Sequence, residues 1–131
     1  MNKLLLALLS GVLLAFSWPS IGAFPLIFIS FIPLLILEDK AVNSKHVFWY
    51  SFLAFFIFNF ITTYWIYHAT FFGAIAAFLV NANLMALAFW LFHKIKKYTS
   101  NRLGYFSFIV LWISMEYLHL NWDLSWPWLT L

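Results

Sequence analysis

Cysteine is absent from this chain of 131 residues, and acidic residues are scarce, with four Asp and Glu in total. Without a thiol, the chain has no disulfide, no thiolate metal site and no thiol nucleophile. It also lacks a glycine-rich phosphate-binding loop and the G-x-S-x-G motif of serine hydrolases. Short motifs therefore assign no catalytic residue and no cofactor to the chain.

Charged residues of either sign make up only 8% of the chain, whereas 66% of its residues are hydrophobic. A soluble domain is about half apolar and about a quarter charged. A chain this short leaves much of its surface exposed after folding, so a small core cannot hide the excess of apolar side chains. Lipid must therefore cover most of the surface, and the composition predicts an integral membrane protein.

The first charge-free window lies between Lys3 and Glu38 and is interrupted by the segment SWPSIG, in which Pro19 lacks an amide proton and Gly22 is conformationally permissive. It predicts two helices, residues 4–16 and 23–37, each shorter than the ~20 residues of a full crossing. The alternative is a cleaved signal peptide. Trp18 and Pro19 stand where such a peptide needs small residues, which favours an uncleaved helical hairpin.

The second charge-free window, residues 46–93, is long enough for two full spans and breaks near HATFFG at residues 68–73. It predicts helices at about 47–67 and 73–92. A fifth apolar run, residues 103–120, follows the polar segment HKIKKYTSNR. Because no repeat or linker is visible, we expect one all-α transmembrane domain over residues 1–131, a membrane helix bundle of about five helices.

Positive charge is confined to alternate connections between these helices. If the amino terminus lies in the cytoplasm, the inner segments 1–3, 38–45 and 93–102 hold every basic residue, and the outer segments hold none. This is the pattern of the positive-inside rule, so the chain is predicted to begin inside and end outside. A net charge of +3 arranged in this way does not indicate nucleic-acid binding, which needs a basic stripe on a polar surface.

Aromatic residues with a polar group gather at the predicted outer boundary: Trp18, Trp65, Tyr67, Trp122, Trp126 and Trp128. Indole and phenol rings settle at the headgroup level, so an aromatic belt is one interpretation. The inner boundary has fewer such rings, mainly Trp49, Trp90 and Tyr98. This asymmetry leaves a functional outer face as the second interpretation.

Small and amide side chains within the spans predict packing contacts. Small residues recur every fourth position, a spacing that lets helix backbones approach closely in lipid: Ala7, Gly11, Ala15, Ala82 and Ala86. Asn59, Asn81 and Asn83 are interpreted as interhelical hydrogen-bonding residues.

Glu116 is the one acid within a predicted span, and such residues usually face the bundle interior and have a partner. Trp112 and His119 share its helical face. Both a structural hydrogen bond and a functional role remain open for Glu116. His68, His119 and Asp123 do not have metal-ligand spacing, so no metal site is predicted.

Four segments taken together carry a family resemblance: SWPSIG at 17–22, TTYWIY at 62–67, MEYL at 115–118 and SWPWLTL at 125–131. In this order, and with this topology, they resemble the amino-terminal membrane region of apolipoprotein N-acyltransferases. The resemblance implies a multi-pass protein of the bacterial inner membrane with a periplasmic functional face. It also implies transfer of an acyl chain from a phospholipid to the amino-terminal cysteine of a lipoprotein.

The resemblance further implies a nitrilase-like catalytic domain with a Glu–Lys–Cys triad and a thioester intermediate. Nothing in this chain resembles that domain, and the chain has no cysteine. We therefore expect the chain to be the amino-terminal part of a longer protein and to be inactive alone. The alternative is a small standalone membrane protein, either a lipid or solute carrier or an interaction scaffold.

In a complete enzyme we expect the outer aromatic residues and Glu116 to form a lipid-facing entrance to the active site. The candidate residues of this entrance are Trp65, Tyr67, Glu116, Trp126, Pro127 and Trp128. Amphipathic rings suit a pocket that holds acyl chains beneath a polar headgroup.

Overall fold

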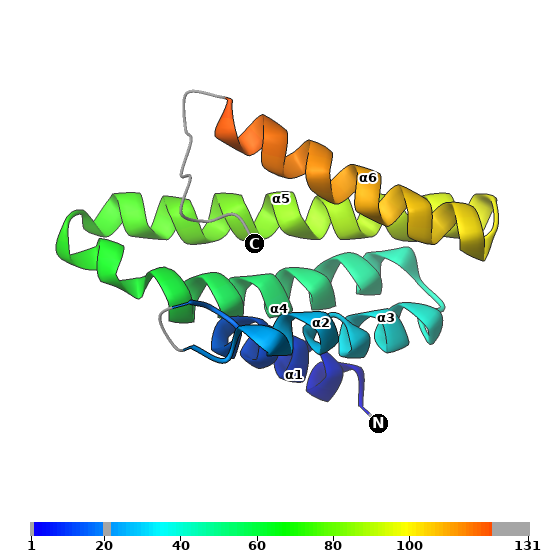
Figure 1. The fold of residues 1–131 in the computed structure, drawn as a ribbon, viewed down its shortest axis with the longest axis horizontal. Helices are drawn as coiled ribbons and strands as arrows, with labels where there is room; N and C mark the ends of the chain where they lie inside the picture. The colour runs from blue at the N-terminus through cyan, green and yellow to red at the C-terminus, as the bar shows by residue number, and fades with distance from the viewer. Residues whose placement is uncertain (1, 20–21, 122–131) are drawn as a thin grey trace.

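The computed structural model describes residues 2–19 and 22–121, and over this part of the chain the ordered elements are helices. Figure 1 shows them as a bundle of roughly antiparallel segments. The elements are α1 (Lys3–Phe16), η1 (Phe24–Leu26), α2 (Ile27–Ser30), α3 (Ile32–Asp39), α4 (Ser44–Thr63), η2 (Tyr64–His68), α5 (Phe71–Tyr98) and α6 (Asn101–Leu120). The predicted all-α membrane helix bundle is therefore confirmed.

The first predicted helix begins and ends within a residue of its expected bounds. The Asn2 side chain caps α1 by accepting a hydrogen bond from the amide of Leu4, as capping residues do for the free amides of a first turn. The helix ends at the SWPSIG segment, where Ser17 donates to the carbonyl of Leu14 and Gly22 has a φ of 85°. That positive φ is open to glycine at no steric cost, so the chain reverses here.

The second predicted helix is divided into η1, α2 and α3. Pro25 and Pro33 lie in the first turns of η1 and α3, where a missing amide proton does no harm. The break at Phe31 leaves the carbonyl of Ser30 free to accept a hydrogen bond from the hydroxyl of Ser10 on α1, at 2.5 Å. The two prolines were the sequence signal for this division, which the predicted range 23–37 did not use.

Three of the described helical segments are long and apolar enough to cross a membrane: Ser44–His68, Phe71–Tyr98 and Asn101–Leu120. The helix Lys3–Phe16 is apolar but shorter. The structure extends α5 six residues beyond its predicted end, into the polar segment that was expected to form a loop. Only Thr99 and Ser100 then separate α5 from α6, so these two helices must be antiparallel neighbours.

Helix α5 lies between α4 and α6, and α1 packs on the other side of α4 (Figure 1). At the contact of α1 with α4, a Cβ atom on Gly11 would lie 2.5 Å from the carbonyl oxygen of Ala54. Ala7 and Ala15, one turn away on either side, are fully buried. The predicted close packing of small residues is therefore confirmed for α1.

The bundle interior combines a phenylalanine core with one amide pair. Phe55, Phe58, Phe89 and Phe92 are among its largest fully buried side chains. Asn81 donates to the side-chain oxygen of Asn59 at 2.7 Å, and Asn59 donates to the carbonyl of Phe55. The predicted amide contact between α4 and α5 is confirmed for these two residues, whereas Asn83 is exposed.

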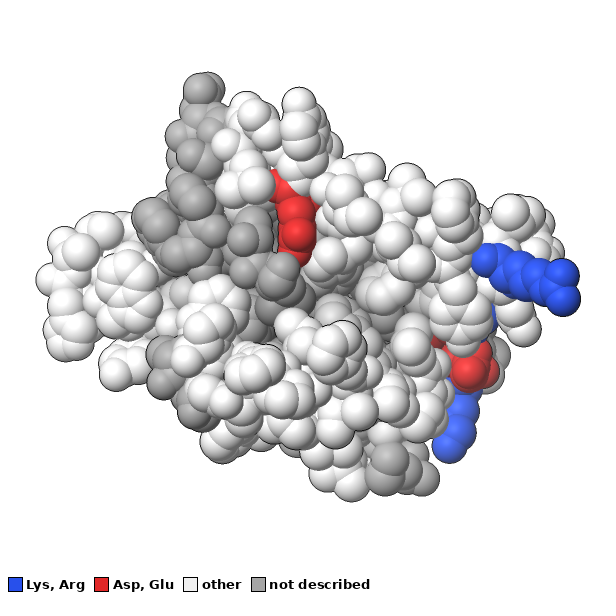
Figure 2. Space-filling model, viewed as in Figure 1, with Lys and Arg blue, Asp and Glu red and all other residues white. Residues whose placement is uncertain are grey.

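Charged side chains are unevenly distributed along the bundle. On the face drawn in Figure 2, Lys and Arg lie at one end. This is the end at which α3 leads to α4 and α5 leads to α6 in Figure 1. The two connections, and the helix ends beside them that hold most of the basic residues, are therefore at one end of the bundle, as the counting of charges requires.

Candidate functional site

An open apolar groove lies between α4 and α5 at the end of the bundle opposite the lysines. Its volume is about 440 Å³, within the range of roughly 300–1,000 Å³ that small-molecule pockets occupy. We call it the aromatic groove, and its lining residues are Phe56, Phe60, Tyr64, Tyr67, Phe71, Ala74, Ile75, Phe78 and Leu79.

The groove exists because α4 tightens into a 3₁₀ turn before the chain reverses. The hydroxyls of Thr62 and Thr63 donate to the carbonyls of Phe58 and Asn59, one turn back. Such back-bonding bends helices, and here η2 follows directly. Thr70 then caps α5 by accepting from the amide of Gly73, so α5 begins as a well-formed wall of the groove.

Aromatic rings line the groove and contact one another across α4, η2 and α5. The rings of Phe56 and Phe60 stack with centroids 6.3 Å apart, and Phe60 meets Phe78 of α5 edge-on at 5.9 Å. Tyr67 of η2 similarly meets Phe71 at 5.6 Å. The phenols of Tyr64 and Tyr67 are the polar groups among the lining side chains, so the groove can hold a hydrocarbon chain but offers little to a charged ligand.

The predicted entrance residues fall on two different parts of the bundle. Tyr67 lines the aromatic groove, and Trp65 lies on the same 3₁₀ turn with about half of its surface exposed. Glu116 lies on α6, which packs mainly on α5, and it is not among the residues that line the aromatic groove. Trp126, Pro127 and Trp128, with Trp122, lie outside the described residues.

Glu116 is half-buried and accepts a hydrogen bond from the indole nitrogen of Trp112 at 3.1 Å. The predicted partnership across one helical turn is therefore present. Trp112 in turn packs edge-on against Phe31 at 5.0 Å and meets the ring of Phe55 of α4 at a tilt, with centroids 5.6 Å apart. Through Trp112, the carboxylate is fixed relative to the phenylalanine core. His119, one turn further on, is buried.

A second apolar groove, of about 310 Å³, lies between α5 and α6. It is lined by Leu84, Leu87, Ala88, Leu91, Leu111, Ser114, Met115, Leu118 and His119. Its aliphatic walls make it a second surface on which a lipid chain can lie.

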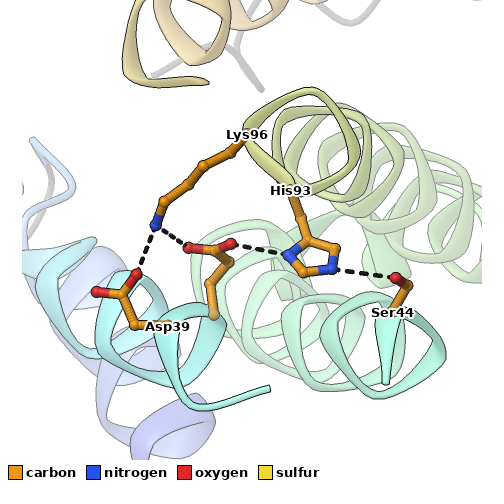
Figure 3. A network of polar contacts seen from close by, with 5 residues as sticks. Asp39, Ser44, His93 and Lys96 are labelled. Carbon is orange, nitrogen blue, oxygen red and sulfur yellow. Dashed lines mark hydrogen bonds and ion pairs between the residues drawn. The ribbon is translucent and has the colours of Figure 1, made fainter. Parts of the chain in front are cut away.

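A polar cluster at the basic end of the bundle was missed by the sequence reasoning, which counted Lys96 for topology and used Glu38 and His93 only as limits of the charge-free windows. His93 Nδ1 lies 2.8 Å from Glu38 Oε1, and His93 Nε2 lies 3.1 Å from the hydroxyl of Ser44. Lys96 Nζ binds both Glu38 and Asp39, each at 2.5 Å. Figure 3 shows Lys96 and His93 reaching from α5 toward Asp39 and Ser44.

The cluster joins α3, α4 and α5 and leaves its central groups buried. Glu38 and His93 are each about 5% exposed. A buried charge must be paired and hydrogen-bonded, which Lys96 and His93 supply for Glu38. Gly104 lets α6 pass close to the Lys96 stem, since a Cβ there would lie 2.5 Å from the Lys96 Cβ. One sequence signal was present: His93 and Lys96 stand three residues apart, on one helical face.

The order hydroxyl, imidazole and carboxylate resembles the hydrogen-bond order of serine hydrolases. Two features argue for a structural role instead. Glu38 is shared with Lys96, so its charge is already compensated by an ion pair. The polar pocket beside the cluster, about 320 Å³, has Glu38, His93 and Lys96 in its wall but not Ser44. We therefore interpret the cluster as a structural contact between helices and not as a candidate active site.

Comparison with known proteins gives two matches. The family model described as apolipoprotein N-acyltransferase N-terminal domain matches residues 10–131. A curated apolipoprotein N-acyltransferase from Chlorobaculum tepidum is 30% identical over 128 residues, which is 95% of this chain and 24% of that protein. This chain thus spans about a quarter of the length of the relative. No solved structure matches the chain.

Proposed function

Because the chain belongs to the apolipoprotein N-acyltransferase family, within its amino-terminal domain, we propose that it forms the membrane-embedded part of such an enzyme. The complete enzyme would transfer an acyl chain from a membrane phospholipid to the amino-terminal cysteine of a lipoprotein. The family resemblance implies a thiol nucleophile for this transfer. This chain contains no cysteine, so the proposal assigns it lipid binding and no catalytic step.

The observation that carries the assignment is the aromatic groove. Its walls are hydrocarbon, its size suits an acyl chain, and it opens between two helices that are long enough to span a membrane. The phenols of Tyr64 and Tyr67 lie at the η2 end. Tyrosine is enriched at sites where one end is apolar and the other is in contact with water. In the proposal the acyl chain occupies the groove, and the headgroup lies beside η2.

The proposed orientation follows from the lysines. With the basic end of the bundle in the cytoplasm, η2 and the aromatic groove face the periplasmic side of the inner membrane. Glu116 is assigned a positioning role: its bond from Trp112 would fix the outer end of α6, where the chain leads on to Trp126 and Trp128. The lipoprotein would be bound by the complete enzyme.

The groove is tested by cross-linking in vesicles with a phospholipid that carries a photoreactive group at the end of one acyl chain. We expect the cross-linked peptides to concentrate on α4, η2 and the first half of α5. Ile75→Trp places an indole in the groove and should reduce this labelling several-fold. Val110→Trp, on the exposed face of α6, is the matched control and should leave it unchanged.

Labelling that follows exposed surface alone, and that Ile75→Trp leaves unchanged in a folded protein, would contradict the role of the groove. The assignment of catalysis has a separate test. Incubation with a phospholipid bearing a labelled acyl chain should give no acyl adduct on this chain. A labelled adduct formed by this cysteine-free chain would overturn that part of the proposal.

A further inference from the structure

A third groove lies between α4 and α5 at the opposite end from the aromatic groove, among the lysines. Its volume is about 280 Å³, and it is lined by Lys45, Phe48, Trp49, Leu87 and Trp90. We call it the basic groove. Trp49 and Trp90 belong to the inner aromatic residues of the sequence, which the proposed function does not use.

A second lysine stands beside this groove. The ammonium group of Lys94, one turn beyond Trp90 on α5, lies 5.2 Å from the centroid of the Trp90 ring and 5.9 Å from that of Tyr98. Lys45 approaches from the first turn of α4. Two positive charges from two helices therefore flank one cavity whose lining contains no acid.

Neither lysine is neutralised within the described part of the chain. The ion pairs found there join Glu38 or Asp39 to His93 or Lys96, and these groups line a different pocket. Lys45 and Lys94 thus differ from Lys96, whose charge is compensated by two carboxylates. The basic groove is left with an excess of positive charge.

Both helices place a lysine at the outer end of the basic groove and apolar or aromatic side chains further in. On α4 the order toward the bundle centre is Lys45 followed by Phe48 and Trp49; on α5 it is Lys94, Trp90 and Leu87. These residues recur at three- and four-residue spacings, so each set shares a helix face. At 1.5 Å per residue the α5 set covers about 10 Å. Charge lies outermost on both helices, and on α5 the indole of Trp90 comes next and the hydrocarbon of Leu87 lies innermost.

We propose that the basic groove binds an anionic phospholipid, such as a phosphatidylglycerol, with its phosphate between the ammonium groups of Lys45 and Lys94. The glycerol region would lie against Trp49 and Trp90, and the start of an acyl chain against Leu87. Basic pockets between membrane helices bind anionic headgroups, and indoles favour the headgroup level. The apolar inner end argues for a lipid rather than a free phosphate, because a phosphate ion gains nothing from Leu87.

The site is tested by native mass spectrometry of this chain in detergent, with phosphatidylglycerol and phosphatidylcholine of the same acyl chains supplied at equal concentrations. We expect the chain to retain phosphatidylglycerol preferentially. Each basic residue near an anionic headgroup contributes a factor of about five. The double variant Lys45→Gln/Lys94→Gln should therefore reduce the preference by at least that factor.

The matched control is Lys40→Gln/Lys97→Gln, which removes the same charge from exposed residues at the same end of the bundle. It should keep the preference. Leu87→Trp, which fills the inner end of the groove, should weaken retention of both lipids without removing a charge.

Three results would overturn the site. An equal loss in the control pair would mean that binding follows net charge. An unchanged preference in Lys45→Gln/Lys94→Gln would place the lipid elsewhere. Displacement of phosphatidylglycerol by millimolar inorganic phosphate would show a free-anion site instead of a lipid site.

Discussion

Two neighbouring carboxylates at the end of α3 bind the same lysine but differ strongly in burial, which makes a controlled experiment possible. Both Glu38 and Asp39 lie 2.5 Å from Lys96 Nζ, whose side chain is 8% exposed. The Glu38 side chain is 5% exposed and that of Asp39 is 59% exposed. Glu38 also binds His93, so removing it leaves two buried groups without that partner.

The expected magnitudes follow from this difference. Breaking a buried ion pair by removing one partner costs about 3–5 kcal/mol, because the other charge stays buried. Lys96 keeps Asp39 in the Glu38→Ala variant, so we expect the lower end, about 3 kcal/mol. Asp39→Ala removes only the exposed pair and should cost about 0–1 kcal/mol. Glu38→Gln should lie between them, since its amide oxygen still accepts from His93.

The free energy of unfolding is measured by titrating the detergent-solubilised chain with sodium dodecyl sulfate and following helix content by circular dichroism. A double-mutant cycle with Lys96→Ala then isolates the coupling to each carboxylate. Coupling to Glu38 should exceed coupling to Asp39 by about 2 kcal/mol, the gap between buried and exposed pairs. Equal losses of unfolding free energy in Glu38→Ala and Asp39→Ala would show that burial of this polar cluster does not contribute to stability.

Two further predictions concern packing and orientation. Gly11→Ala should destabilise the chain by about 1–3 kcal/mol, despite the better helix propensity of alanine, because the new Cβ meets the rigid carbonyl of Ala54 at 2.5 Å. Ala76→Leu on the exposed face of α5 should change stability by less than about 0.5 kcal/mol, and a similar cost at both sites would contradict tight packing at α1. Because the chain has no cysteine, single cysteines report orientation without background: a membrane-impermeant maleimide on intact cells should label His68→Cys and not Lys40→Cys. The reverse pattern would mean that the bundle is inserted the other way round.

Much of the fold follows from local sequence. The polar caps Asn2, Ser100 and Thr70 stand before apolar runs, and the helices begin there. The divided second helix was also readable in principle, because Pro33 falls in the interior of the predicted range 23–37, where a proline interrupts a continuous helix. The end of α5 was predicted six residues early because charge was taken as a sign of a loop. A lysine-rich last turn is instead favourable for a helix, whose carboxyl end carries partial negative charge.

The candidate site was predictable only in part. Tyr67 was selected as an amphipathic ring at a boundary, and it does line the aromatic groove. Its neighbours Phe56 and Phe78 were not selected, because a phenylalanine in a membrane helix looks the same in sequence whether it faces lipid or a cavity. The Trp112–Glu116 contact was predictable, because both residues lie on one helix and a spacing of four residues places their side chains on the same face.

By itself, the sequence determined that lipid surrounds most of this protein and that its helix ends fall into a basic and a non-basic class. Its apolar excess requires lipid, and the positions of its lysines divide the helix ends into two classes. Only the tertiary structure decided which faces meet: Glu38 and His93 are 55 residues apart, yet they share a hydrogen bond. The grooves between α4 and α5 likewise depend on how two helices are rotated against each other. Short-range spacing fixes a helix and its faces, whereas the partner of each face depends on the packing of the whole bundle. The missing side chain at Gly11, which lets α1 approach α4 closely, and the Asn59–Asn81 hydrogen bond between α4 and α5 favour one arrangement.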